Sequence, residues 1–144
     1  MNASERWSSL QPQLLSVLRM VMAFLFFQYG SAKLIAFPGP IMPGGGTAPL
    51  SSLAGIAGLL EMTGGTLLFV GLFTRPVAFV LCGEMAIAYF HGHAGRGFWP
   101  VLNLGAPAVS FCFVWLYLSA AGGGPWSLDA LRLGRPLAPG FTPR

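Results

Sequence analysis

The sequence predicts an all-α integral membrane protein, a bundle of four transmembrane helices that forms one domain over residues 1–144. Composition is the first reason: 54% of the residues are hydrophobic and only 8% are charged, against roughly 25% charged in soluble proteins. The second reason is that four continuous apolar segments occur, each near the ~20 residues that a helix needs to cross ~30 Å of hydrocarbon. Because the segments are continuous rather than alternating, helices are favoured over the strands of a membrane barrel.

The predicted spans lie at about residues 14–35, 50–73, 76–90 and 102–121. The first contains Arg19 and Lys33, is longer than the apolar core of a signal peptide and lacks a convincing cleavage site, so we interpret it as a retained helix. The third is short and follows a tight break at Arg75–Pro76. We expect it to tilt, or to use Tyr89 and the residues after it at the membrane interface.

The segments outside the spans contain clear turn and cap signals. Loop 36–49 is rich in Pro and Gly and is not expected to be helical throughout. We interpret it as a plain linker in preference to a mobile lid. Ser127 is placed to cap a short tail helix at 128–133, with Leu128 and Leu131 towards the membrane. This tail is predicted to be an interfacial anchor.

Basic residues predict the orientation of the chain. One side of the membrane would hold both termini and the loop between spans two and three, with Arg6, Arg75, Arg132, Arg135 and Arg144. The opposite side would hold only Arg96 among its loop residues. The positive-inside rule then predicts a multi-pass protein of the inner (cytoplasmic) membrane with both termini in the cytoplasm, and Arg75 as an anchor in the turn. No basic cluster is interleaved with aromatic residues, so no nucleic-acid partner is expected.

Charges inside the spans are the strongest functional signal, because such residues are costly in lipid and are usually functional. Arg19 would lie ~8 Å deep, while Glu61 and Glu84 would lie near the midplane. Lys33 lies near the outer end of the first span, so two acids balance two bases. We therefore expect Arg19, Glu61 and Glu84 to share one layer if their helices face one another.

Helical phase predicts that each span turns one polar face inward. The four faces comprise Arg19, Met22, Ala23, Phe26, Gly30 and Lys33; Ala54, Gly58, Glu61, Gly65 and Leu68; Glu84, Ala88 and His91; and Asn103, Ser110 and Tyr117. Small residues on the second face would let a neighbouring helix approach closely. Four such faces would enclose a polar or partly hydrated centre.

These residues define a candidate ligand or proton site, whose members are Arg19, Lys33, Glu61, Glu84, His91 and Asn103. The alternative is a structural ion-pair network that fixes helix register. For Lys33, extension of the side chain to the outer interface is the favoured alternative.

The histidines and cysteines are weaker signals. His91 and His93 give an isolated H-x-H pattern that no further His or Cys joins, so no metal site is expected. Cys82 and Cys112 form no C-x-x-C pair, and we attribute them to helix packing.

Four motifs together resemble the DoxX family of small four-helix membrane proteins. They are Arg19 followed by Gly30-Ser31-Ala32-Lys33-Leu34, the run from Glu61 to Arg75 with Gly64-Gly65 and Thr74-Arg75, Gly97-Phe98-Trp99-Pro100, and the segment from Gly122 to Asp129. The resemblance covers about residues 14–131. One departure is that relatives often continue past the Asn of span four as N-G-G-E, whereas here Leu104-Gly105-Ala106 follows Asn103. A polar group that some relatives carry is therefore missing.

The resemblance implies a membrane subunit or accessory factor of a quinone-linked redox system, with a quinone as the candidate cofactor and a redox protein as the candidate partner. No nucleophile–base–acid set, phosphate loop or dinucleotide fingerprint occurs, so an independent enzyme is not expected. The alternative is a non-enzymatic binding, transport or assembly module in which the buried charges are structural. The lipid bilayer is a partner in either case, and helix faces of small residues are compatible with a homo-oligomer.

Overall fold

The computed structural model describes residues 2–134, so Arg135 and Arg144, which entered the charge count above, lie outside it. Within this range there are helices and no strands, which confirms the all-α fold class. The elements are α1 (Ala3–Ser9), α2 (Gln11–Ile35), α3 (Leu53–Val70), α4 (Thr74–Gly92), the 3-10 helix η1 (Ala94–Arg96), α5 (Ala106–Ala121) and α6 (Leu128–Arg132).

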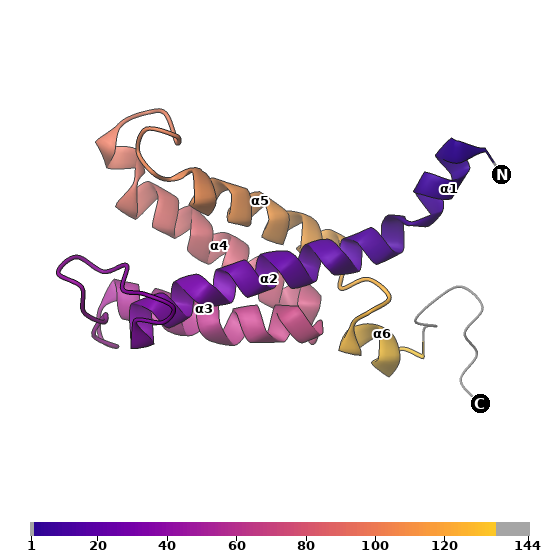
Figure 1. The fold of residues 1–144 in the computed structure, drawn as a ribbon, viewed down its shortest axis with the longest axis horizontal. Coiled ribbons are helices and arrows are strands. Elements are labelled where there is room, and N and C mark those ends of the chain that lie inside the picture. Colours follow the sequence, from indigo (N-terminus) through magenta and orange to yellow (C-terminus); the bar gives the residue numbers. More distant parts are fainter. Residues whose placement is uncertain (1, 135–144) are drawn as a thin grey trace.

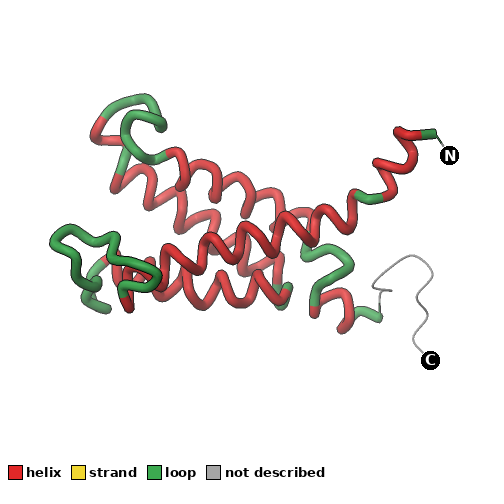
Figure 2. Tube along the Cα trace, viewed as in Figure 1, coloured by secondary structure: helices red, strands yellow, loops and turns green. Residues whose placement is uncertain are grey.

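The long helices form two antiparallel hairpins, α2 with α3 and α4 with α5 (Figure 1). Residues 36–52 and 93–105 connect helices at one end of the molecule, the loop end, on the left of Figures 1 and 2. Helices α1 and α6 lie at the opposite end, which we call the terminal end. The helices α2, α3 and α4 are long and apolar enough to cross a membrane, and α5 is a shorter apolar helix. This arrangement is that of a membrane helical bundle.

Local capping explains where the helices begin and end. The second predicted span begins as a helix at Leu53, because the Ser52 hydroxyl accepts the Gly55 N–H at 3.1 Å. It ends at Gly71, whose φ of 71° is left-handed and suits glycine. The fourth span begins as a helix only at Ala106, with a proline in its first turn, because residues before it form turns.

The core around α5 is apolar and aromatic, so the polar inner face predicted for the fourth span is wrong. Phe26 packs against Phe111 and Trp115 with ring centroids 5.0 and 5.2 Å apart. Ser110 and Tyr117, expected on the inner face of α5, are exposed. The inner face of α5 carries Ala108, Phe111, Trp115 and Leu118 instead. Burying large aromatic rings outweighs burying a polar stripe, and this decides the rotation of α5.

On α2 and α3, the structure buries residues that the sequence predicts for the inner faces. These are Arg19, Ala23, Phe26 and Gly30 on α2, and Gly58, Glu61, Gly65 and Leu68 on α3. Glycine makes this contact close: a Cβ added at Gly30 would lie 2.7 Å from the Gly58 oxygen and from the Met62 nitrogen. The two backbones therefore touch at this point, as in small-residue contacts between membrane helices.

The Arg19 side chain holds the terminal end together. It is fully buried, and its Nε donates to the Gly123 carbonyl at 2.8 Å. Its other nitrogens donate to the carbonyls of three further residues, Leu68, Phe69 and Trp126. Carbonyls at the end of a helix have no partner inside it, and a cation there is also favoured by the helix dipole. Arg19 thus joins α2 to the end of α3 and to the chain after α5.

Asp129 makes the complementary contact at the start of α4. Its carboxylate accepts the Phe73 N–H at 2.8 Å and the Thr74 N–H at 2.7 Å. Burial by itself would raise the pKa of Asp129, but these backbone hydrogen bonds and nearby Arg132 outweigh it and hold that pKa below its usual value. The predicted tail helix is confirmed as α6, where the Ser127 hydroxyl accepts the Ala130 N–H at 3.1 Å.

Arg75 makes structural hydrogen bonds in addition to contributing a positive charge. Its guanidinium donates to the carbonyls at the end of α5, which belong to Ser119, Ala120 and Ala121. These carbonyls lack partners inside the helix, as those of α3 do. The turn between the two hairpins and the end of the second hairpin are therefore connected.

We predict that Gly30→Ala destabilises the protein by about 1–3 kcal/mol, because the new methyl group collides with the α3 backbone. Gly83→Ala is the matched control, since a Cβ at Gly83 meets nothing within 4 Å. It should be neutral or stabilising by up to about 1 kcal/mol through helix propensity. Thermal unfolding in lipid nanodiscs measures both, and equal effects of the two variants would show that the α2–α3 contact is not tight.

We predict that Asp129→Asn lowers Tm at neutral pH, because the two N–H groups at the start of α4 lose their anionic acceptor. A carboxylate whose folded-state pKa is depressed stabilises the fold above its unfolded pKa, and the contribution is lost as the pH falls through the folded-state value. The difference in Tm between wild type and variant should therefore shrink below roughly pH 4. A difference that stays constant from neutral to acid pH would argue against this role.

Candidate functional site

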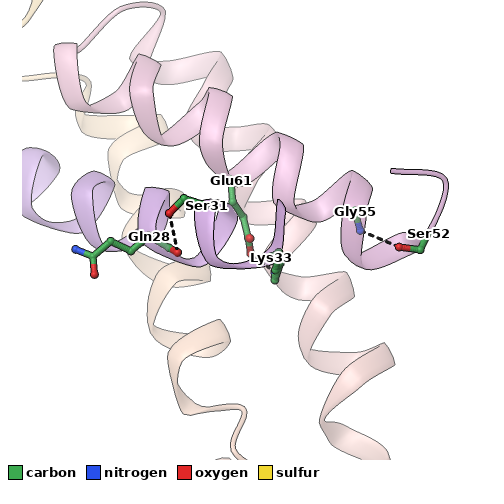
Figure 3. Close-up of polar contacts among 6 residues, drawn as sticks. All are labelled: Gln28, Ser31, Lys33, Ser52, Gly55 and Glu61. Atoms are coloured by element: carbon green, nitrogen blue, oxygen red, sulfur yellow. Dashed lines mark hydrogen bonds and ion pairs between the residues drawn. The ribbon is translucent and has the colours of Figure 1, made fainter. Parts of the chain in front are cut away.

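A direct ion pair joins α2 and α3 within the bundle. Lys33 Nζ lies 2.6 Å from Glu61 Oε1, and Figure 3 shows the two side chains turned towards each other. The Glu61 side chain is 2% exposed and that of Lys33 19%. The pair forms because Gly58 brings the helices close: a Cβ at Gly58 would lie only 3.2 Å from Lys33 Cβ. Lys33 therefore points to Glu61, and the expected extension to the interface is wrong.

Glu84 on α4 lies beside this pair. Both of its carboxyl oxygens are buried and have no hydrogen-bond partner among the described residues, and the same holds for Glu61 Oε2. The charged groups that act on Glu84 electrostatically are Glu61 and Lys33. Three helices thus contribute two carboxyl groups and one ammonium, a set that we call the acid cluster (Lys33, Glu61 and Glu84). It is electrically neutral when it holds one additional proton.

Arg19 does not belong to the acid cluster, so the expected layer of Arg19 with Glu61 and Glu84 is wrong. Along α2, Arg19 lies about 21 Å from Lys33, at ~1.5 Å per residue. Its donors are bound to backbone carbonyls at the terminal end. Arg19 stays at the terminal end because backbone carbonyls there satisfy its donors, and depth along separate spans does not reveal this.

His91 and Asn103 also lie apart from the acid cluster. His91 is exposed. Asn103 is buried, but it holds the loop end: its Nδ2 donates to the Gly97 carbonyl and its Oδ1 accepts the Gly105 N–H, both at 2.8 Å. The carbonyl of Asn103 contacts Nδ1 of His93 at 3.0 Å. Asn103 is thus a structural residue of the motif that begins at Gly97.

A groove on α2 was not anticipated from the sequence, and none of the acid-cluster residues lines it. It has a volume of about 550 Å³ and lies between α2 and the first loop. Its lining comprises Leu25, Gln28, Tyr29, Ala32, Pro38, Gly39, Pro40 and Ile41. Ser31 fixes the loop against α2, since its hydroxyl donates to the Phe37 carbonyl at 2.8 Å. The groove is apolar apart from Gln28 and Tyr29.

The Gln28 side chain is the polar group of this groove that sequence reasoning missed. Figure 3 shows it pointing away from Lys33 and Glu61, and no hydrogen bond from its amide to the described residues occurs. An amide without partners inside a predicted span is itself a signal, because lipid offers it no hydrogen bond. The groove therefore combines an amide and a phenol ring with an otherwise apolar lining, which is the usual make-up of a small-molecule site.

Two other features do not extend the site. A cleft of about 670 Å³ lies at the terminal end between α4, α5 and α6, where Arg75 and Asp129 are bound to the backbone. It lies far from the acid cluster, so we do not assign it the same function. Over residues 2–134 there is no group of three or more His, Cys, Asp or Glu side chains that could hold a metal ion.

Comparison with known proteins places the chain in a family. The sequence model of the DoxX family matches residues 14–94. A protein of Haemophilus influenzae described as "Uncharacterized protein" is 41% identical over 132 residues, which are 90% of this chain and 96% of that relative. No solved structure matches the chain significantly. The family match covers α2, α3 and α4, which carry the acid cluster, and the chain belongs to the DoxX family.

Proposed function

We propose that this protein is a membrane subunit or accessory factor of a quinone-linked redox system, in which the acid cluster binds and releases a proton. The observation that carries the proposal is Glu84, whose two buried oxygens lack any donor beside the Lys33–Glu61 pair. A buried carboxylate without donors is costly, whereas a carboxylic acid is less so. Quinone reduction takes up protons with electrons, which gives such a site a use.

The groove beside α2 supports the quinone part of the proposal. Gln28 and Tyr29 would orient the ring carbonyls, and Leu25, Ala32 and the proline-rich loop would contact its apolar parts. Gln28 precedes Lys33 by about 8 Å along α2, at ~1.5 Å per residue. Lys33 would connect the helix that lines the groove, through Glu61, to the proton-exchanging Glu84. An associated redox protein would supply or accept the electrons, as the family resemblance implies.

The same proposal includes the orientation in the inner membrane, with both termini in the cytoplasm. Arg6, Arg75 and Arg132 lie at the terminal end, and Arg96 lies at the loop end. An excess of arginine on one side is the pattern that the positive-inside rule describes.

A structural function of the charges is the second candidate, and the direct Lys33–Glu61 bond favours it. A pair at 2.6 Å that is nearly excluded from solvent can fix the register of α2 against α3 without any ligand. In that case the protein would be a binding, transport or assembly module. The first candidate predicts that substitutions at the site weaken quinone binding while the bundle stays folded. The second predicts no quinone binding and a loss of stability when the ion pair is broken.

We predict that Gln28→Leu weakens the binding of a short-chain ubiquinone by about tenfold, which corresponds to about 1.4 kcal/mol, while Tm stays near wild type. Glu61→Gln should keep a folded bundle but weaken binding, and Glu84→Gln should abolish the dependence of binding on pH. The matched control is Glu5→Gln in the exposed helix α1. Quenching of tryptophan fluorescence in nanodiscs measures the affinity across neutral and mildly acid pH.

Two outcomes would count against the proposed function. If Gln28→Leu and Glu61→Gln both bind quinone as wild type does, the site should be abandoned. If wild type itself binds no quinone and Glu61→Gln lowers Tm, the ion pair is structural and the second candidate is correct.

A further inference from the structure

Two cysteines that the sequence separates by 30 residues meet in the second hairpin. The Sγ atoms of Cys82 on α4 and Cys112 on α5 lie 3.6 Å apart. The Sγ of Cys112 also lies 3.5 Å from the Cys82 carbonyl oxygen. Both residues are free thiols, and each lies near the middle of its helix. The contact therefore places two thiols together inside the apolar layer.

The two sulfurs are in non-bonded contact. The sulfurs of a disulfide are about 2.05 Å apart, so the two atoms must approach by about 1.5 Å. Rotation of two short side chains supplies most of this movement, because α4 and α5 pack closely along their length. Both cysteines are half-buried, so a molecule dissolved in the lipid can reach the sulfurs from outside the bundle.

We propose that Cys82 and Cys112 form a dithiol–disulfide couple that a membrane quinone oxidises. The location selects the reagent, because water-soluble oxidants do not partition into the middle of a span, whereas quinones do. In the reaction both S–H bonds break and one S–S bond forms. The two electrons pass to the quinone, whose carbonyl oxygens take the two protons, so that one quinol is produced for each disulfide. The bond then links α4 to α5.

This redox couple is separate from the acid cluster. Cys82 and Glu84 are two positions apart on α4, and residues at this spacing face different sides of a helix. The couple shares with the proposed function only the chemical class of its oxidant. Neither the groove at Gln28 nor the proton at Glu84 is needed for it, so the two proposals fail in different experiments.

The test uses the full-length, reduced protein in nanodiscs, treated with a short-chain ubiquinone. We expect intact mass spectrometry to show the loss of two hydrogen atoms per chain, with both cysteines then resistant to maleimide after denaturation. Ultraviolet absorbance should show one quinol formed per disulfide, and a thiol reductant should reverse the change. Oxidised glutathione, which stays in water, should react far more slowly.

The controls are Cys82→Ala and Cys112→Ala, each checked for a wild-type Tm before use. Both should form no intramolecular disulfide and no stoichiometric quinol, whereas Gln28→Leu and Glu61→Gln should form the disulfide as wild type does. Two free thiols after quinone treatment would overturn the proposal, even if diamide produces the disulfide, because the acceptor would then be wrong. A covalent quinone adduct or a disulfide between two chains would overturn it as well.

Discussion

The binding of the Arg19 guanidinium by four backbone carbonyls is the interaction on which the arrangement of the helices depends. A charge in the interior of an apolar bundle must be satisfied by the bundle itself. The planar guanidinium has enough donors to bind carbonyls at the end of α3 and carbonyls of the chain after α5 together. Once Gly123 and Trp126 are held there, Asp129 reaches the first N–H groups of α4. The turn between the hairpins is thereby fixed from both sides.

This fixed turn sets the rotation of α3 and α4, and so decides which side chains meet further along. Glu61 and Glu84 face a common region because their helices leave the turn at defined angles. The glycine contact between α2 and α3 then brings Lys33 to Glu61. One ammonium meets two carboxyl groups, and the second carboxyl group finds no donor. At the terminal end Arg19 donates to four carbonyls, whereas three carboxyl oxygens of the acid cluster have no donor among the described residues.

That contrast is the physical argument for function. Buried polar groups in native proteins are nearly always hydrogen-bonded, and an exception calls for an explanation. Replacing Glu84 by an apolar residue would remove the unsatisfied group at no cost in hydrogen bonds. The chain instead keeps a titratable side chain at a buried position, where its charged form lowers the stability of the fold. A site that must gain and lose a proton requires this property, and a purely structural ion pair does not.

Composition and helical phase were sufficient to predict the fold class, the inner faces of α2 and α3 and the tail helix capped by Ser127. They failed where long-range packing decides. The partner of Glu61 depends on the glycine contact that aligns Lys33, and depth along separate spans does not reveal it. The face of α5 was misjudged because Phe111 and Trp115 gain more from burial than a polar stripe does. The contact of Cys82 with Cys112 leaves no local signal, since it arises from the hairpin.

Infrared spectroscopy tests most directly whether Glu84 holds a proton. Spectra of the protein in nanodiscs at neutral pH would be compared for wild type, Glu84→Gln and the control Glu5→Gln. The account predicts a carbonyl stretching band of a protonated carboxyl group in wild type and in the control, and its loss in Glu84→Gln. The absence of such a band in wild type, or a band that survives in Glu84→Gln, would contradict the account.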